Sequence, residues 1–140
     1  MMFNSNKKFA VIGLGLFGKK LALELAQMDH QVLAIDRDEE PVTEVRDEIN
    51  KAVIGDASKQ ELLDELVTPD FDALIVTLAT NLEASLLCVL HARKIGVEHI
   101  IAKSNGPEHT TILQRLGTDE IIMPEEDVAT QLARSLGESR

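Results

Sequence analysis

The chain has 140 residues, one cysteine and a formal net charge of −10, and its length fits a single domain. The negative charge argues against binding to nucleic-acid backbones, and a lone cysteine excludes an internal disulfide. No stretch reaches the roughly 18 apolar residues of a membrane span, and the first eight residues lack the apolar segment of a signal peptide, so we expect a cytoplasmic protein.

The first predicted element is a short apolar strand that runs directly into three glycines, in the segment FAVIGLGLFG at residues 9–18. We expect Gly13 to allow a tight turn, Gly15 to let backbone N–H groups approach phosphate oxygens, and Gly18 to let a helix pack close to the strand. The N-terminus of that helix would offer about half a positive charge to an anion. The alternative is a tight strand-to-helix turn that binds no ligand.

A helical pattern follows at once, with apolar side chains spaced along one face: Phe17, Leu21, Leu25 and Met28. The next apolar run, residues 32–36, is predicted as a second strand that ends in Asp36. In dinucleotide-binding βαβ units, an acid at this place accepts hydrogen bonds from ribose hydroxyls. Since Asp36 would repel a 2′-phosphate, it favours an unmodified ribose. We expect the neighbouring Arg37 to point to solvent.

The rest of the chain repeats this alternation of strand and helix. Strands are predicted to start near Phe9, Val32, Ala52, Ala73, His99 and Glu120. Helix caps are predicted at Ser58, Thr80 and Asn105, each followed three residues later by glutamate. We therefore predict an α/β fold, with residues 1–140 forming one Rossmann-like, doubly wound domain. Its six-stranded parallel sheet has the order 3-2-1-4-5-6, with helices on both faces.

Ligands of such sheets bind beyond the carboxyl ends of the strands. Asp56 follows the third strand, where it can accept a hydrogen bond from an adenine amino group or cap the next helix. Lys103 ends the fifth strand, where a charge needs a partner, either a bound phosphate or a salt bridge to Asp36 or Glu125. The predicted nucleotide-binding residues are Gly13, Gly15, Leu16, Phe17, Gly18, Asp36, Arg37, Asp56, Ala57, Thr77, Leu78, Ala79, Asn81 and Lys103.

The sequence contains no recognisable catalytic centre. Glu125 follows the sixth strand, and a metal ion, a salt bridge or the dipole of the last helix would each account for it. The four histidines share no metal-ligand spacing, and we interpret all of them as structural or surface residues. After the sixth strand only residues 125–140 remain, which leaves no room for a substrate domain. We therefore expect the pocket to hold or sense a nucleotide, and the protein not to be an enzyme.

These motifs together resemble the TrkA-N domain, also called the KTN or RCK N-terminal domain, of Trk- and Ktr-type potassium-uptake regulators. The resemblance covers residues 7–138 and includes the glycine segment, the strand ending at Asp36, the VIGD run ending at Asp56, Asn81, and the IIMPE run ending at Glu125. It implies a cytoplasmic gating subunit that binds ATP, ADP or NAD(H). Such subunits form dimers and octameric rings and dock on a membrane K⁺ transporter.

The resemblance also implies roles for single residues. Asp36 would hold the ribose, Asp56 the adenine edge, and Lys103 the phosphate side. Glu125 would lie near a cation, Mg²⁺ or another, between neighbouring subunits. One position departs from the family: many Ktr-type members have arginine where this chain has Leu16, and leucine cannot reach the phosphates of a neighbouring nucleotide.

A second departure is that the family's usual C-terminal ligand domain does not occur in these 140 residues. The sequence leaves two alternatives to the regulatory role. The chain would be the NAD-binding domain of an oxidoreductase if a catalytic domain lies elsewhere. A redox-sensing transcription factor would need a helix-turn-helix segment, and the sequence shows none.

Overall fold

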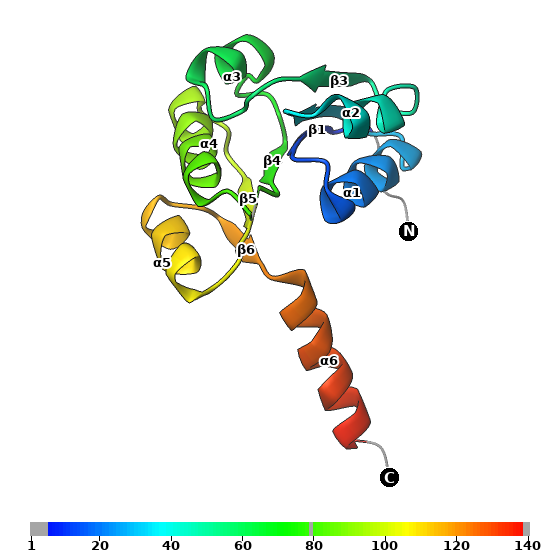
Figure 1. Cartoon of the computed structure of the whole chain (residues 1–140), viewed down its shortest axis with the longest axis vertical. Coiled ribbons are helices and arrows are strands. Elements are labelled where there is room, and N and C mark those ends of the chain that lie inside the picture. Colours follow the sequence, from blue (N-terminus) through cyan, green and yellow to red (C-terminus); the bar gives the residue numbers. More distant parts are fainter. Residues whose placement is uncertain (1–5, 79, 139–140) are drawn as a thin grey trace.

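Six parallel strands alternate with six helices in a computed structural model that describes residues 6–78 and 80–138 (Figure 1). The strands are β1 Lys8–Ile12, β2 Gln31–Asp36, β3 Lys51–Ile54, β4 Ala73–Val76, β5 Ile100–Lys103 and β6 Glu120–Ile122. The helices are α1 Leu16–Gln27, α2 Glu39–Val45, α3 Gln60–Leu66, α4 Leu82–Ile95, α5 Pro107–Arg115 and α6 Pro124–Glu138. Each strand begins within one residue of its predicted start.

The sheet has the order β3-β2-β1-β4-β5-β6, which confirms the predicted doubly wound fold. The central strands β1 and β4 pair in parallel, with Phe9 opposite Ala73 and Ile12 opposite Val76. Successive strands are added on one side of β1 and then on the other. The loops that follow β1 and β4 therefore leave in opposite directions and open a crevice at the carboxyl edge of the sheet.

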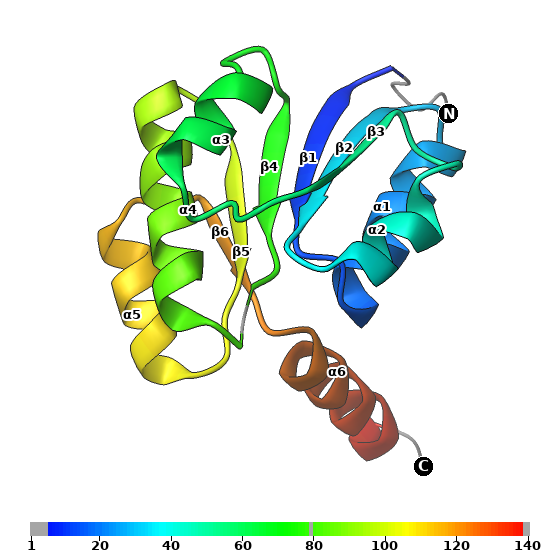
Figure 2. The ribbon, with the colours of Figure 1, turned by 45° about the horizontal axis from the view of Figure 1, so that its top comes forward.

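Helices cover both faces of the sheet, and each face has its own apolar core. Helices α3, α4 and α5 lie on one face, and α1 and α2 lie on the other (Figure 2). The core of the first face includes Leu63 of α3, Val89 of α4 and Leu113 of α5. The core of the second face includes Ala22 of α1 and Val42 of α2. Cys88 belongs to the first core, and burial raises the pKa of its thiol to about 12, which suits a packing role.

The predicted helix caps were wrong by one residue in each case. The observed caps are Lys59, Asn81 and Gly106, and only that of Asn81 uses its side chain, which accepts a hydrogen bond from the Ala84 N–H at 3.0 Å. Two of the predicted caps are engaged elsewhere. The Ser58 hydroxyl donates to Asp56, and the Asn105 N–H donates to the Nδ1 atom of His109.

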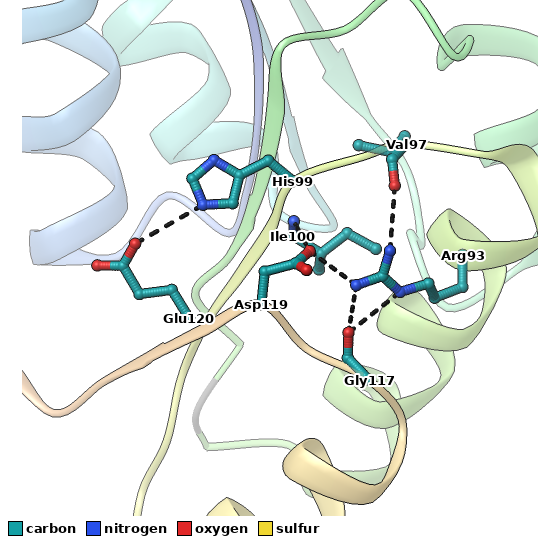
Figure 3. A network of polar contacts seen from close by, with 7 residues as sticks. All are labelled: Arg93, Val97, His99, Ile100, Gly117, Asp119 and Glu120. Carbon is teal, nitrogen blue, oxygen red and sulfur yellow. Dashed lines mark hydrogen bonds and ion pairs between the residues drawn. The ribbon is translucent and has the colours of Figure 1, made fainter.

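Arg93 of α4 fastens the turn between α5 and β6, at the amino ends of β5 and β6 (Figure 3). Its guanidinium donates to the carbonyl oxygen of Gly117 and forms an ion pair with Asp119 at 2.7 Å. The same Asp119 carboxylate accepts a hydrogen bond from the Ile100 N–H at 2.7 Å. This network stabilises the edge of the sheet opposite to the crevice.

Helix α6 extends away from the sheet, and none of its described residues is buried (Figure 1). Val128, Leu132 and Leu136 recur every four residues and are 62 %, 58 % and 67 % exposed. These three side chains form an apolar stripe, named here the α6 stripe, because positions four apart share one face of a helix. No described helix is long and apolar enough to cross a membrane.

The apolar face predicted for α1 contacts the sheet only in part. The buried residues of α1 are Gly18 and Ala22, because the close approach of helix and strand leaves room only for small residues. Phe17, Leu21 and Leu25 are instead half-buried and border a groove of about 230 Å³ that reaches across to β5 and β6. We name this the α1–β6 groove. The fourth predicted residue, Met28, is 48 % exposed.

Candidate nucleotide-binding site

The crevice at the carboxyl edge of the sheet contains a cavity of about 660 Å³. It brings together eleven of the predicted residues: Gly13, Gly15, Leu16, Asp36, Arg37, Asp56, Ala57, Thr77, Leu78, Asn81 and Lys103. Phe17 and Gly18 line a second cavity beside it, and Ala79 lies outside the described residues. Seven further residues that were not predicted also line the first cavity: Ile12, Leu14, Ile35, Asp38, Gly55, Thr80 and Ala84. The only indication of them in the sequence was that they lie close to the predicted strand ends.

Two of the three glycines that follow β1, one in the loop and one in the first turn of α1, are required by the fold itself. Gly13 has a φ of +98°, and a Cβ atom there would lie 2.5 Å from Oγ1 of Thr77. A Cβ atom on Gly18 would lie 1.9 Å from the carbonyl oxygen of Gly13. A Cβ atom on Gly15, in contrast, would meet nothing within 4 Å. The second glycine is therefore the one whose open side faces the cavity.

Thr77, at the end of β4, connects the two strands that border the crevice. Its hydroxyl lies 2.9 Å from the carbonyl oxygens of both Ile12 and Gly13 and donates to one of them at a time. This bond spans the sheet between β4 and the glycine loop. It fixes the loop in the geometry that exposes the N-terminus of α1.

Asp36 ties the glycine loop to the end of β2. One carboxylate oxygen accepts a hydrogen bond from the Leu14 N–H at 2.7 Å, and the other accepts one from the Asp38 N–H at 2.8 Å. Each carboxylate oxygen can accept more than one hydrogen bond, so ribose hydroxyls can still be bound. Arg37 is exposed, as expected, although it borders the cavity.

Asp56 lies in the turn between β3 and α3. Its Oδ1 atom accepts two hydrogen bonds from Ser58, one from the N–H at 2.9 Å and one from the hydroxyl at 2.6 Å. These two bonds hold the pKa of the Asp56 carboxyl below its usual range. The carboxylate thus stabilises the turn before α3 rather than the first turn of the helix. It still lines the cavity, where a base could donate to it.

Lys103 borders both cavities, and its Nζ atom lies 5.8 Å from the centre of the Phe17 ring. Within residues 6–78 and 80–138, it forms no salt bridge to Asp36 or Glu125, so that alternative is not realised. The ring face attracts the ammonium group and holds it beside the N-terminus of α1.

Glu125 lies in the first turn of α6, beside the second cavity. That cavity also measures about 660 Å³ and is lined mainly by apolar side chains. Leu16 lies between the two cavities and is 92 % exposed. The part of the chain that the structure describes contains no group of three acidic, histidine or cysteine residues that could hold a metal ion. A cation site shared between two subunits stays a prediction.

Two buried histidines attach the loops at the carboxyl edge to other elements. The Nε2 atom of His109 lies 3.0 Å from the Ser85 hydroxyl of α4, and its Nδ1 atom accepts a hydrogen bond from the Asn105 N–H at 3.1 Å. Burial lowers the pKa of His109 and favours its neutral form. His91 of α4 contacts the carbonyl oxygen of Ser58 at 3.0 Å. Each histidine thus ties its helix to another element of the chain.

Most of this chain matches a known protein family. The family model of the TrkA-N domain matches residues 9–124. The chain belongs to the TrkA-N domain family. The resemblance inferred from the motifs is therefore confirmed.

Relatives of this TrkA-N domain include named potassium-uptake proteins. It is 35 % identical over 139 residues to Ktr system potassium uptake protein A of Vibrio alginolyticus. It is 38 % identical over 133 residues to the protein of the same name from Bacillus subtilis strain 168. These alignments cover 99 % and 95 % of this chain but only 63 % and 60 % of the two relatives. This chain thus spans less than two thirds of their length.

Solved structures with the same fold include nucleotide-bound ones. The NAD(P)-binding domain of an exopolyphosphatase-related protein from Archaeoglobus fulgidus matches with a TM-score of 0.81 at 20 % identity, over 96 % of this chain and 100 % of that one. The GsuK channel bound to NAD matches at 0.72 and 15 %, over 88 % and 22 %. GsuK bound to ADP matches at 0.70 and 16 %, over 85 % and 31 %. At such identities the likeness establishes the fold.

Proposed function

We propose that this TrkA-N domain is the nucleotide-binding part of a cytoplasmic regulatory subunit of a K⁺ transporter, and that residues 1–140 form one such domain. The observation that carries the proposal is the cavity at the glycine loop, where the N-terminus of α1 and the Asp36 carboxylate face the same space. A helix N-terminus suits a phosphate, and a carboxylate suits a ribose. The relatives named as potassium uptake proteins support the regulatory role.

The ligand in this proposal is NAD(H) or an adenosine phosphate, ATP or ADP. Gly15 and the N–H groups at the start of α1 contact the phosphates, with Lys103 beside them. Asp36 holds the ribose, and Asp56 accepts from the adenine amino group. Glu125 holds a cation, Mg²⁺ or another, at the junction of two subunits. The NAD-bound and ADP-bound GsuK structures support both kinds of nucleotide as candidates.

The bound nucleotide acts by changing the geometry between paired domains, which the membrane partner then detects. A coupling free energy of roughly 1–3 kcal/mol between ligand and pore is enough for regulation. The oxidoreductase alternative is not favoured, because the matched relatives are named as potassium uptake proteins. The site therefore senses a nucleotide without transforming it.

Ligand binding is tested by thermal unfolding with ATP, ADP, AMP, NAD⁺ and NADH, each with and without Mg²⁺. A ligand present at 100 times its Kd adds about 2.7 kcal/mol of stability, which raises the Tm by roughly 5–10 °C. We expect such a rise with at least one nucleotide. If none of them raises the Tm, the proposed site is wrong.

The regulatory role is tested by K⁺ uptake in cells that carry the full-length gene or lack it.

Self-association is part of the same proposal, and the α6 stripe supports it. Three leucine- or valine-sized side chains in open solvent are costly, since burial of each would stabilise an assembly by about 1.5–3 kcal/mol. The α1–β6 groove offers an apolar surface on the sheet face that α1 leaves partly uncovered. We propose that α6 of a second copy packs into this groove, which produces a dimer, and that further contacts between dimers produce a ring.

The double substitution Leu132→Asp and Leu136→Asp is therefore expected to weaken the dimer by more than about 100-fold, because two apolar contacts are lost and two charges are introduced. Light scattering after size-exclusion chromatography at several micromolar concentrations measures this. Thr130→Asp adds a charge on the opposite side of α6 and should leave the dimer intact. A wild-type protein that stays monomeric, or equal dissociation by Thr130→Asp, would contradict the proposed interface.

A further inference from the structure

His91 lies on the buried, mainly apolar face of α4, and it is only 8 % exposed. Its Nε2 atom lies 3.0 Å from the carbonyl oxygen of Ser58. A carbonyl oxygen can only accept, so Nε2 carries the proton and donates it. The other ring nitrogen, Nδ1, is buried as well, and among the described residues it has no hydrogen-bond partner. Burying it is unfavourable, so the bond to Ser58 must offset that cost.

The residue that His91 holds is the same residue that orients Asp56. The carbonyl group of Ser58 accepts from His91, while its N–H and hydroxyl groups donate to Oδ1 of Asp56 at 2.9 Å and 2.6 Å. The turn is closed by one further bond, from the Lys59 N–H to the carbonyl oxygen of Asp56 at 3.1 Å. Helix α4 thus reaches the carboxylate at the cavity wall through two successive hydrogen bonds.

We propose that His91 is a positioning residue for base recognition, which holds the Ser58 turn so that the Asp56 carboxylate faces the exocyclic amino group of an adenine. This inference rests on the proposed nucleotide-binding function. Adenine presents a 6-amino donor to a carboxylate, whereas hypoxanthine presents a 6-oxo acceptor that a carboxylate repels. A correctly held Asp56 therefore distinguishes the two bases, and a turn that has lost its anchor distinguishes them less well.

The first variant is His91→Leu, which removes the donor and keeps an apolar side chain of similar size. Calorimetry measures the Kd values of ADP and IDP, or of NAD⁺ and its hypoxanthine analogue if only dinucleotides bind. The wild-type protein should prefer the adenine form by at least tenfold. We expect His91→Leu to reduce this preference by about tenfold, almost entirely through weaker binding of the adenine form.

The conservative variant His91→Gln should restore the preference, because the glutamine amide places a donor near the position of Nε2. The exposed His99 provides a matched control, and His99→Leu should keep the wild-type preference. If His91→Leu does not fold, Ser58→Ala replaces it. That variant removes the hydroxyl bond to Asp56 but keeps the N–H bond, so the preference should fall by about threefold.

Each outcome has one meaning. Equal weakening of both nucleotides by His91→Leu, or an unchanged preference in Ser58→Ala, assigns His91 to general stability and overturns the inference. A wild-type protein that binds both bases equally also overturns it, but leaves nucleotide binding intact. If the wild-type protein binds no nucleotide, the proposed function fails first, and the inference fails with it.

Discussion

Replacement of Gly18 by alanine is expected to destabilise the protein by about 3 kcal/mol and to abolish nucleotide binding. The added Cβ atom would lie 1.9 Å from the carbonyl oxygen of Gly13 and 2.8 Å from Oγ1 of Thr77. Neither neighbour can move away cheaply, since the first is backbone and the second bonds to that same part of the loop. Helix α1 must therefore shift from the sheet, and its N-terminus leaves the cavity. Chemical denaturation and calorimetry measure the two effects.

Gly15→Ala is the matched control for this prediction. Its Cβ atom would meet no protein atom within 4 Å, and its φ of −69° suits any residue. We expect stability within about 0.5 kcal/mol of the wild type. Nucleotide affinity should nevertheless fall by about 10- to 100-fold, because the methyl group occupies the space through which a phosphate approaches the backbone. A fully stable Gly18→Ala protein, or unimpaired binding by Gly15→Ala, would contradict the account of the loop.

The second large effect is expected from Asp36→Ala, which should weaken nucleotide binding by about 100-fold or more. Hydrogen bonds to a charged group contribute about 1.5–3 kcal/mol each, and this carboxylate serves both the ligand and the protein. The Leu14 and Asp38 N–H groups would lose their acceptor, so the glycine loop would also become less ordered. The measurement is the Kd of ADP or NAD⁺, together with thermal stability.

A ribose analogue separates the two contributions of Asp36. If the carboxylate binds the 2′-hydroxyl, the wild-type protein prefers ADP to 2′-deoxy-ADP, and Asp36→Ala loses that preference. Asp47→Ala changes the net charge equally at an exposed position outside the cavity and should behave as the wild type. If Asp36→Ala keeps the preference for ADP, the residue supports only the loop.

Most of the strand positions, and the glycine loop at the centre of the site, could be predicted from residues that are close together in the sequence. Residues 9–18 contain both the apolar strand and the glycines, and the reason for each glycine depends on atoms only a few residues or one strand away. The helix caps were less predictable, because Ser58, Thr80 and Asn81 all have side chains able to cap a helix. The choice among them depends on competing partners, as Ser58 shows by bonding to Asp56.

Other parts of the site depend on residues that are distant in the sequence. The Thr77 hydroxyl meets the Gly13 carbonyl across 64 positions, and His91 meets Ser58 across 33. No periodicity or motif in the sequence indicates such pairs. They arise because the sheet order places β4 beside β1, and because α4 packs on the face where the turn before α3 also lies.

The sequence by itself determined the alternation of buried strands and helices, the glycine loop after β1 and the acid at the end of β2. These features are local, since burial on both faces of a strand and the absence of a Cβ atom appear in neighbouring residues. Only the tertiary structure decided that Leu16 lies exposed between two cavities, that α1 contacts the sheet through Gly18 and Ala22, and that the α6 stripe is uncovered. Those outcomes depend on how closely the elements approach, which the apolar pattern of a single element does not specify.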